Sequence, residues 1–262
     1  MRDADVNTLR QILNIIAFVA TVVINILANT IPIGGKTTGE LSALYPNLFV
    51  PAGITFSIWG VIYIMLGLFV VYQAKDLFKL KKDPIVDQIG WWFVVTSLAN
   101  IAWIYAWHYE RVLTSLLLML ILLAALLKIY LGLGIGQTVV SGAKKYLVHL
   151  TFSIYLGWIT VATIANVTAL LVALEWNRFG LSDAFWTVLV LIVATAITLT
   201  MLRRRGDVFY AIVVIWAFVG IFIRHVATLG VPSWFLLLVL IIAIVVLTYN
   251  VVTRFQTWLQ NG

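Results

Sequence analysis

The chain has 262 residues, of which 63% are hydrophobic and 10% are charged, and its mean hydropathy is +1.07. A soluble domain has about 25% charged residues, so this composition excludes an ordinary water-soluble globule and favours a membrane protein. The formal net charge is +7, but the basic residues form short runs between apolar segments, which is not the basic face that nucleic acids need. There is no cysteine, which excludes disulfides, thiol catalysis and cysteine metal sites.

Eight apolar segments have about the 20 residues with which a helix crosses the hydrocarbon of a bilayer. They are residues 12–31, 52–73, 88–108, 112–133, 146–174, 184–202, 208–228 and 233–253. Each is expected to be a helix, because a strand would leave backbone groups unpaired in lipid. The first segment is too long for a signal-peptide core, so we expect it to be retained. The sequence therefore predicts an all-α polytopic membrane bundle of eight transmembrane helices.

The basic residues divide unequally between the two sides of such a bundle. If the N-terminus is cytoplasmic, thirteen lie on the inner side: Arg2, Arg10, Lys75, Lys79, Lys81, Lys82, Lys128, Lys144, Lys145, Arg203, Arg204, Arg205 and Arg254. Four lie on the outer side: Lys36, Arg111, Arg178 and Arg224. Because cytoplasmic loops are rich in lysine and arginine, this division predicts cytoplasmic N- and C-termini. We expect a multi-pass protein of a prokaryotic plasma membrane.

The longest outer connection runs from about Pro32 to Val50. Within it, Lys36 and Glu40 are four residues apart, so a brief helical turn is expected to pair them. A loop of this length on a sparse outer face either covers a pocket or is a simple connector, and the sequence favours neither.

Two spans each carry tryptophan and asparagine on one helical face. The residues are Asn100, Trp103 and Trp107 in the third span, and Trp158, Ala162 and Asn166 in the fifth. If these faces converge, they form an apolar, aromatic pocket with a few hydrogen-bonding groups, as in small-molecule sites. The alternative is that the asparagines bond across helices and the tryptophans pack or lie at the membrane interface. Spacing alone favours this alternative.

The second span opens with Pro51, Gly53, Phe56 and Trp59, and Tyr63 follows. Together with the two faces above, this pattern resembles the TspO/translocator protein family, the tryptophan-rich sensory proteins. Members of that family carry a proline-glycine-aromatic motif in the second span, Asn-x-x-Trp in the third, and Tyr-Leu-x-Trp, then Ala and Asn, in the fifth. Tyr155 and Leu156 complete the fifth-span match, and the resemblance covers roughly residues 10 to 175.

The resemblance implies a five-helix core, residues 1–175, that binds hydrophobic ligands such as porphyrins, haem or sterols in a cavity covered by the first loop. A tetrapyrrole is thus a candidate ligand, with no cofactor assigned. The implied ligand-binding residues are Pro51, Gly53, Phe56, Trp59, Tyr63, Asn100, Trp103, Trp107, Tyr155, Trp158, Ala162 and Asn166. It also implies a homodimer, although three additional transmembrane helices in residues 176–262 compete for that surface.

The sequence departs from the family pattern at Ile54, where members have tryptophan, and in a shorter spacing from Gly53 to Trp59. Porphyrin photochemistry is therefore not carried over.

Other chemistry has less support in the sequence. No acidic residue lies near the middle of a span, which weakens an ion-coupled transporter but keeps a secondary transporter or permease as the alternative. His108 and His225 lie near the outer ends of their spans and are expected to be interfacial, without metal.

The triplet Arg203, Arg204 and Arg205 is expected to act first as a stop-transfer signal and second as a contact for anionic lipid. No nucleophile–base pair or phosphate loop is visible, so we expect no enzyme. The expected partners are membrane lipids and a hydrophobic small molecule.

Overall fold

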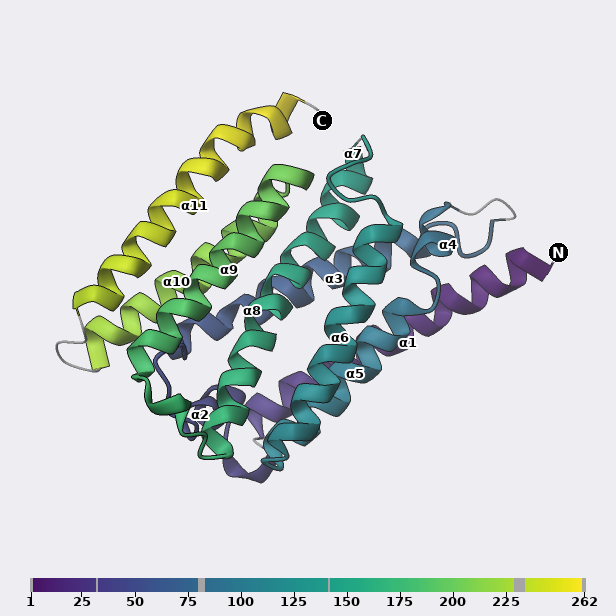
Figure 1. Ribbon diagram of the computed structural model, residues 1–262. Coiled ribbons are helices and arrows are strands. Elements are labelled where there is room, and N and C mark those ends of the chain that lie inside the picture. The colour runs from purple at the N-terminus through teal and green to yellow at the C-terminus, as the bar shows by residue number, and fades with distance from the viewer. Residues whose placement is uncertain (1, 32, 80–82, 141, 229–233, 261–262) are drawn as a thin grey trace.

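The computed structural model describes residues 2–31, 33–79, 83–140, 142–228 and 234–260, and within them the secondary structure is entirely helical (Figure 1). The long helices are α1 (Arg2–Thr30), α3 (Ile58–Ala74), α5 (Trp92–His108), α6 (Val112–Gly132), α8 (Leu150–Ala173), α9 (Asp183–Arg205), α10 (Val208–Thr228) and α11 (Trp234–Gln260). The short ones are η1 (Ile33–Gly35), α2 (Thr38–Ala43), η2 (Gly53–Ser57), α4 (Ile85–Ile89), α7 (Gly142–Lys144), η3 (Lys145–His149) and η4 (Arg178–Gly180). The predicted all-α membrane bundle is confirmed. Pro32, Lys81, Lys82 and Ser233, which belong to expected segments, lie outside the described residues.

Seven helical segments of the described chain are long and apolar enough to cross a membrane. The remaining expected span, residues 88–108, is divided at Gly90 (φ 55°, ψ −133°), which ends α4 and leaves α5 with 17 residues. A helix of 17 residues is about 25 Å long, at the short end of the range for a span. It still runs the length of the bundle, because Asp87 before it bonds Arg10 and Glu110 after it bonds Lys36.

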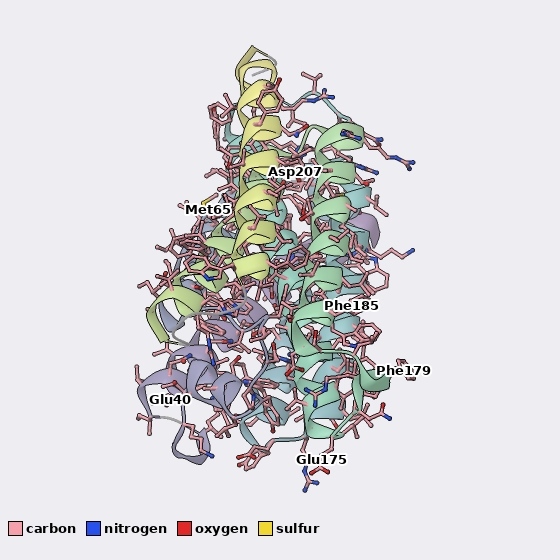
Figure 2. The ribbon with its side chains drawn as sticks, turned by 60° about the vertical axis from the view of Figure 1, so that its left-hand side comes forward. Glu40, Met65, Glu175, Phe179, Phe185 and Asp207 are labelled. Atoms are coloured by element: carbon pink, nitrogen blue, oxygen red, sulfur yellow. The ribbon has the colours of Figure 1, made fainter. Side chains whose placement is uncertain are left out.

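Both ends of the chain lie toward the same end of the bundle. Figure 1 shows the N-terminus, α4, α7 and the last turns of α11 there, and α2 at the opposite end. Figure 2 likewise shows Glu40 and Glu175 far from Asp207. Ion pairs connect the charged segments at the end that holds the termini, with Lys75 3.4 Å and Lys144 3.8 Å from the Asp83 carboxylate. An even number of crossings accounts for this placement, while the cytoplasmic orientation stays a prediction.

One buried face of α1 carries a row of polar side chains: Asn7, Gln11, Asn14, Thr21 and Asn25. Steps of three, four and seven residues place them on one side of the helix. The Asn14 Nδ2 donates to Gln73 Oε1 at 2.9 Å, and the Asn25 Nδ2 donates to Asn100 Oδ1 at 2.7 Å. The row therefore ties α1 to α3 and α5 by interhelical hydrogen bonds. The regular spacing of these polar residues is visible in the sequence, although the sequence analysis did not single out the α1 residues.

Asn25→Leu is expected to destabilise the bundle by about 1 kcal/mol, because interhelical hydrogen bonds in membrane proteins contribute about that much. Thermal unfolding of the detergent-solubilised protein measures the effect. Asn29→Leu is the matched control, since Asn29 is exposed one turn later and bonds only the Asn25 carbonyl of its own helix. Equal unfolding temperatures for the two variants would contradict a stabilising bond from Asn25 to Asn100.

Of the last three long helices, α10 packs directly on the preceding ones. Gly157 of α8 faces α10, where an added β-carbon would lie 3.0 Å from the Tyr210 carbonyl oxygen. α10 also contacts η2, and α9 and α11 pack against α10 and each other. The boundary predicted between residues 175 and 176 therefore separates two groups of helices that share an extensive interface. Their independence as domains stays a prediction.

Candidate functional site

Trp59, on the first turn of α3, lies at the centre of an aromatic cluster. Its ring stacks on Tyr63, with centroids 5.5 Å apart and planes at 16°. Trp158 of α8 meets it edge-on at 6.2 Å, and Tyr155 does so at 6.1 Å. Trp103 of α5 lies 6.4 Å away. The aromatic residues of the second, third and fifth expected spans thus converge.

A cavity of about 50 Å³ lies against this cluster. Eight of the residues expected at a ligand site line it: Pro51, Phe56, Trp59, Trp103, Trp107, Trp158, Ala162 and Asn166. Five of them come from the two tryptophan faces, and Pro51, Phe56 and Trp59 come from the second-span motif that carried the family resemblance. Whether these residues bind a ligand stays a prediction.

The other four expected residues lie outside the cavity lining. Tyr63 stacks on the Trp59 ring, and Tyr155 meets that ring edge-on. Gly53 is exposed in η2, and Asn100 is buried against α1, where it accepts the bond from Asn25. Asn100 therefore makes the cross-helix bond that was the alternative interpretation of the intramembrane asparagines.

The polar groups at the cavity are few, and some are not satisfied by the protein. Asn166 Oδ1 accepts a hydrogen bond from Ser115 Oγ at 2.7 Å, and Trp107 Nε1 donates to the Thr38 carbonyl at 3.3 Å. Within the described chain, the buried Nε1 atoms of Trp103 and Trp158 have no hydrogen-bond partner. A buried donor without an acceptor costs about 1–3 kcal/mol, so an acceptor placed in the cavity would recover stabilisation.

The loop between α1 and α3 covers the cavity, since Thr38, Ser42 and Phe49 line it. Of the two roles left open by the sequence, the structure places this loop in the covering one. The loop contains the expected helical turn, α2, which begins with a capping box in which Glu40 accepts the backbone N–H of Thr37 at 2.7 Å. That bond lowers the pKa of the Glu40 carboxyl.

The expected Lys36–Glu40 pair was wrong. Glu40 is occupied by the helix cap, and Lys36 instead lies 3.3 Å from Glu110, next to the end of α5. The Thr-x-x-Glu spacing at residues 37–40 is a capping-box signature that sequence analysis could have used.

The sequence was also compared with models of known protein families. The sequence model of the family described as TSPO-like protein matches residues 11–252. The chain belongs to the TSPO-like protein family. The match extends through α9 and α10 and into α11, beyond the residues that carried the motif resemblance. No match is found among curated proteins or among solved structures. This TspO-type protein is thus a multi-pass integral membrane protein.

In this TSPO-like protein α10, one of the last three long helices, also contributes to the site, a role that sequence analysis missed. Ala217 and Ile221 of α10 form part of the cavity wall. Trp216 Nε1 donates to the Thr55 carbonyl at 2.9 Å, which joins α10 to the motif segment η2. Residues so far apart in the chain leave no local pattern that would predict this contact.

His108 and His225, expected near the outer ends of their spans, have structural partners. A ring nitrogen of His225 lies 2.8 Å from the Leu48 carbonyl oxygen, and His108 Nδ1 lies 2.8 Å from that of Ile104. His225 thereby fixes the covering loop to α10. Among the described residues, no group of three or more His, Asp or Glu side chains is arranged to hold a metal ion.

A larger cavity of about 390 Å³ adjoins the aromatic one at the same end of the bundle. It lies between the covering loop, the end of α8 and the start of α9, with Trp176 and Trp186 in contact at 4.8 Å on one wall. Phe49 lines both cavities and is almost fully buried. The Phe49 side chain therefore separates the larger outer space from the aromatic cavity.

Proposed function

We propose that this TspO-type protein binds a hydrophobic small molecule in the aromatic cavity beneath the covering loop, as a ligand-binding or sensory protein without enzymatic activity. The observation that carries the proposal is the pair of buried indole N–H groups, of Trp103 and Trp158, that lack partners beside an apolar cavity. Apolar walls with a few convergent polar groups are the usual composition of a small-molecule site.

The size of the cavity adds a requirement. Small-molecule sites are about 300–1,000 Å³, so a space of about 50 Å³ does not fit a tetrapyrrole or a sterol in the present arrangement. We infer that binding displaces Phe49 and joins the aromatic cavity to the adjoining one of about 390 Å³. The joined space reaches the size of a ligand site, and the covering loop is the element that must move.

A secondary transporter or permease is the second candidate. The observation that favours it is the row of buried amides along α1, which provides polar groups across most of the bundle. Reconstituted vesicles separate the two candidates. Accumulation of substrate that depends on an ion gradient would overturn the pure binding protein.

Trp103→Ala and Trp158→Ala are expected to weaken porphyrin binding about tenfold each, because an aromatic contact contributes about 0.5–1.5 kcal/mol beyond its buried area. Quenching of intrinsic fluorescence by protoporphyrin or haem, with a sterol as competitor, measures the affinity. Trp92→Ala is the control on the same helix, since Trp92 is 41% exposed and lies outside the cavity.

Removal of a buried tryptophan also destabilises the protein, so Trp103→Phe provides a second test. This variant retains an aromatic ring but lacks the N–H group, and an affinity between those of the wild type and Trp103→Ala is expected. Quenching without saturation, or equal affinities for Trp103→Ala and Trp92→Ala, would refute the proposed site.

A further inference from the structure

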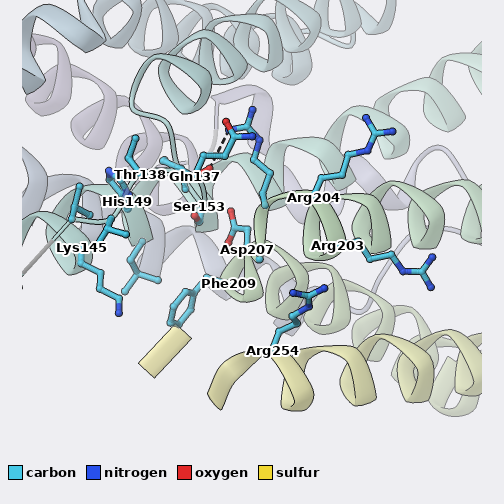
Figure 3. Close-up of a pocket in the computed structure, with 17 residues that line it drawn as sticks. Gln137, Thr138, Lys145, His149, Ser153, Arg203, Arg204, Asp207, Phe209 and Arg254 are labelled. Atoms are coloured by element: carbon cyan, nitrogen blue, oxygen red, sulfur yellow. Dashed lines mark hydrogen bonds between the residues drawn. The ribbon is translucent and has the colours of Figure 1, made fainter. Parts of the chain in front are cut away.

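A second site of different chemistry lies at the opposite end of the bundle, where the chain termini are. It is a cavity of about 410 Å³ between residues 135–140, the first turns of the helix that becomes α8, and the ends of α9 and α11. Figure 3 shows side chains from all of these segments around one space.

The cavity is strongly basic. Arg203, Arg204 and Arg205 from α9 and Arg254 from α11 line it. Arg205 is held in place, because its guanidinium donates to the Ile135 carbonyl at 3.1 Å and lies over the Tyr130 ring. The other three arginines form no hydrogen bond or ion pair within the described chain, and all three are exposed at the rim. Three cationic groups are therefore available to an external anion.

The one carboxylate among the described residues of this lining does not neutralise them. Asp207 is buried, and its two oxygens accept hydrogen bonds from the Tyr130 hydroxyl at 2.8 Å and from the Tyr210 backbone N–H at 3.0 Å. These bonds turn the Asp207 carboxylate toward its two donors, one of which is in the first turn of α10. The charge that faces the cavity is thus positive.

An unsatisfied buried side chain points to the same space. His149 is only 7% exposed, lines the cavity, and has a buried Nε2 atom without a partner in the described chain. It belongs to η3, a single turn of π-helix, and such turns occur frequently at functional sites. Figure 3 shows Ser153 between His149 and Asp207 on the wall of this cavity. The imidazole provides a hydrogen-bonding group deep in a basic cavity.

We propose that this cavity binds the phosphate group of an anionic membrane lipid. Arginine matches phosphate with several N–H donors, and basic pockets between transmembrane helices bind lipid headgroups. The position supports a lipid source, because the arginines lie at the ends of α9 and α11, which are both membrane-spanning. Phe209 lines the same cavity and packs on Phe255 at 6.3 Å, which gives the headgroup site an apolar wall.

Binding of phosphatidylglycerol by the full chain in neutral detergent tests the proposal, with phosphatidylcholine and inorganic phosphate as comparison ligands. The wild type should retain phosphatidylglycerol in native mass spectra in preference to phosphatidylcholine. Arg204→Gln and Arg254→Gln should each weaken this binding about fivefold, as expected for one basic residue near an anionic headgroup. Both arginines lack hydrogen bonds in the described chain, so unfolding temperatures should stay near that of the wild type.

Lys128→Gln is the matched control. Lys128 is an exposed cation in the last turns of α6, and it does not line the cavity. Its phosphatidylglycerol affinity should equal that of the wild type. An equal loss in Lys128→Gln, or equal retention of the two lipids, would overturn the site. Binding of inorganic phosphate without retention of phosphatidylglycerol would overturn the lipid assignment. Porphyrin binding should be unchanged in the arginine variants, which separates this site from the proposed function.

Discussion

Asp207→Ala should lower the free energy of unfolding by about 2–4 kcal/mol, the combined loss of a helix cap and of a partner for a buried hydroxyl. Asp207 is the residue before α10, and its Oδ1 caps that helix by accepting the Tyr210 N–H at 3.0 Å. Its Oδ2 accepts the buried Tyr130 hydroxyl at 2.8 Å. Alanine leaves both donors unpaired. Circular dichroism during thermal unfolding in detergent measures the loss.

Asp207→Asn is the control that distinguishes hydrogen bonding from charge. The asparagine carbonyl still caps α10, and the Tyr130 hydroxyl can turn to accept from the amide, so a loss of less than half is expected. If Asp207→Asn were as unstable as Asp207→Ala, the lost stability would come from the carboxylate charge, and the capping account would fail.

A comparison of the wild type with Asp207→Asn also gives a prediction for the pH dependence of stability. Burial raises the pKa of the Asp207 carboxyl above its ordinary value. Between the pKa of the unfolded chain and this raised pKa, the folded protein binds the proton more tightly, so stability falls as pH rises. Asp207→Asn should lack this decrease. Parallel pH profiles of unfolding temperature for wild type and variant would contradict a raised pKa.

The order and positions of the long helices could be predicted because a lipid environment demands long apolar helical segments. The length of an apolar segment did not predict the interruption at Gly90. The positive φ of this residue ends α4 before α5 begins. Its immediate neighbours, Ile89 and Trp91, are both apolar, so hydropathy gives no sign of a break at this residue. Backbone conformation, which hydropathy does not report, divides this segment.

The spacing of residues along a helix shows which of them share a face, and this made part of the candidate site predictable. Trp103 and Trp158 both contact Trp59, because each lies on the face that its helix turns toward α3. Asn100 is on the same predicted stripe as Trp103 but is nearer to α1, where it bonds Asn25. Spacing specifies the face of a helix, whereas the neighbour that packs on each turn depends on the other helices.

Gly220→Ala should destabilise the protein by about 1–3 kcal/mol, the usual cost of overpacking, and should also weaken porphyrin binding. Gly220 of α10 lies so close to η2 that an added β-carbon would overlap Thr55 Oγ1 and lie 2.8 Å from Thr55 Cγ2. The Gly220 carbonyl also accepts the Ala52 N–H at 2.9 Å. Because η2 carries Phe56 and leads into Trp59, a displacement of η2 moves two walls of the cavity.

Two further variants make this prediction specific. Gly60→Ala, in α3, should retain full stability and binding, because no atom lies within 4 Å of an added β-carbon there. Thr55→Ala combined with Gly220→Ala should recover part of both losses, since it removes the two nearest atoms, and Thr55 Oγ1 has no partner in the described chain. Normal porphyrin affinity in Gly220→Ala would mean that ligand binding does not depend on the close contact between η2 and α10. This contact would then serve only to attach the last three helices.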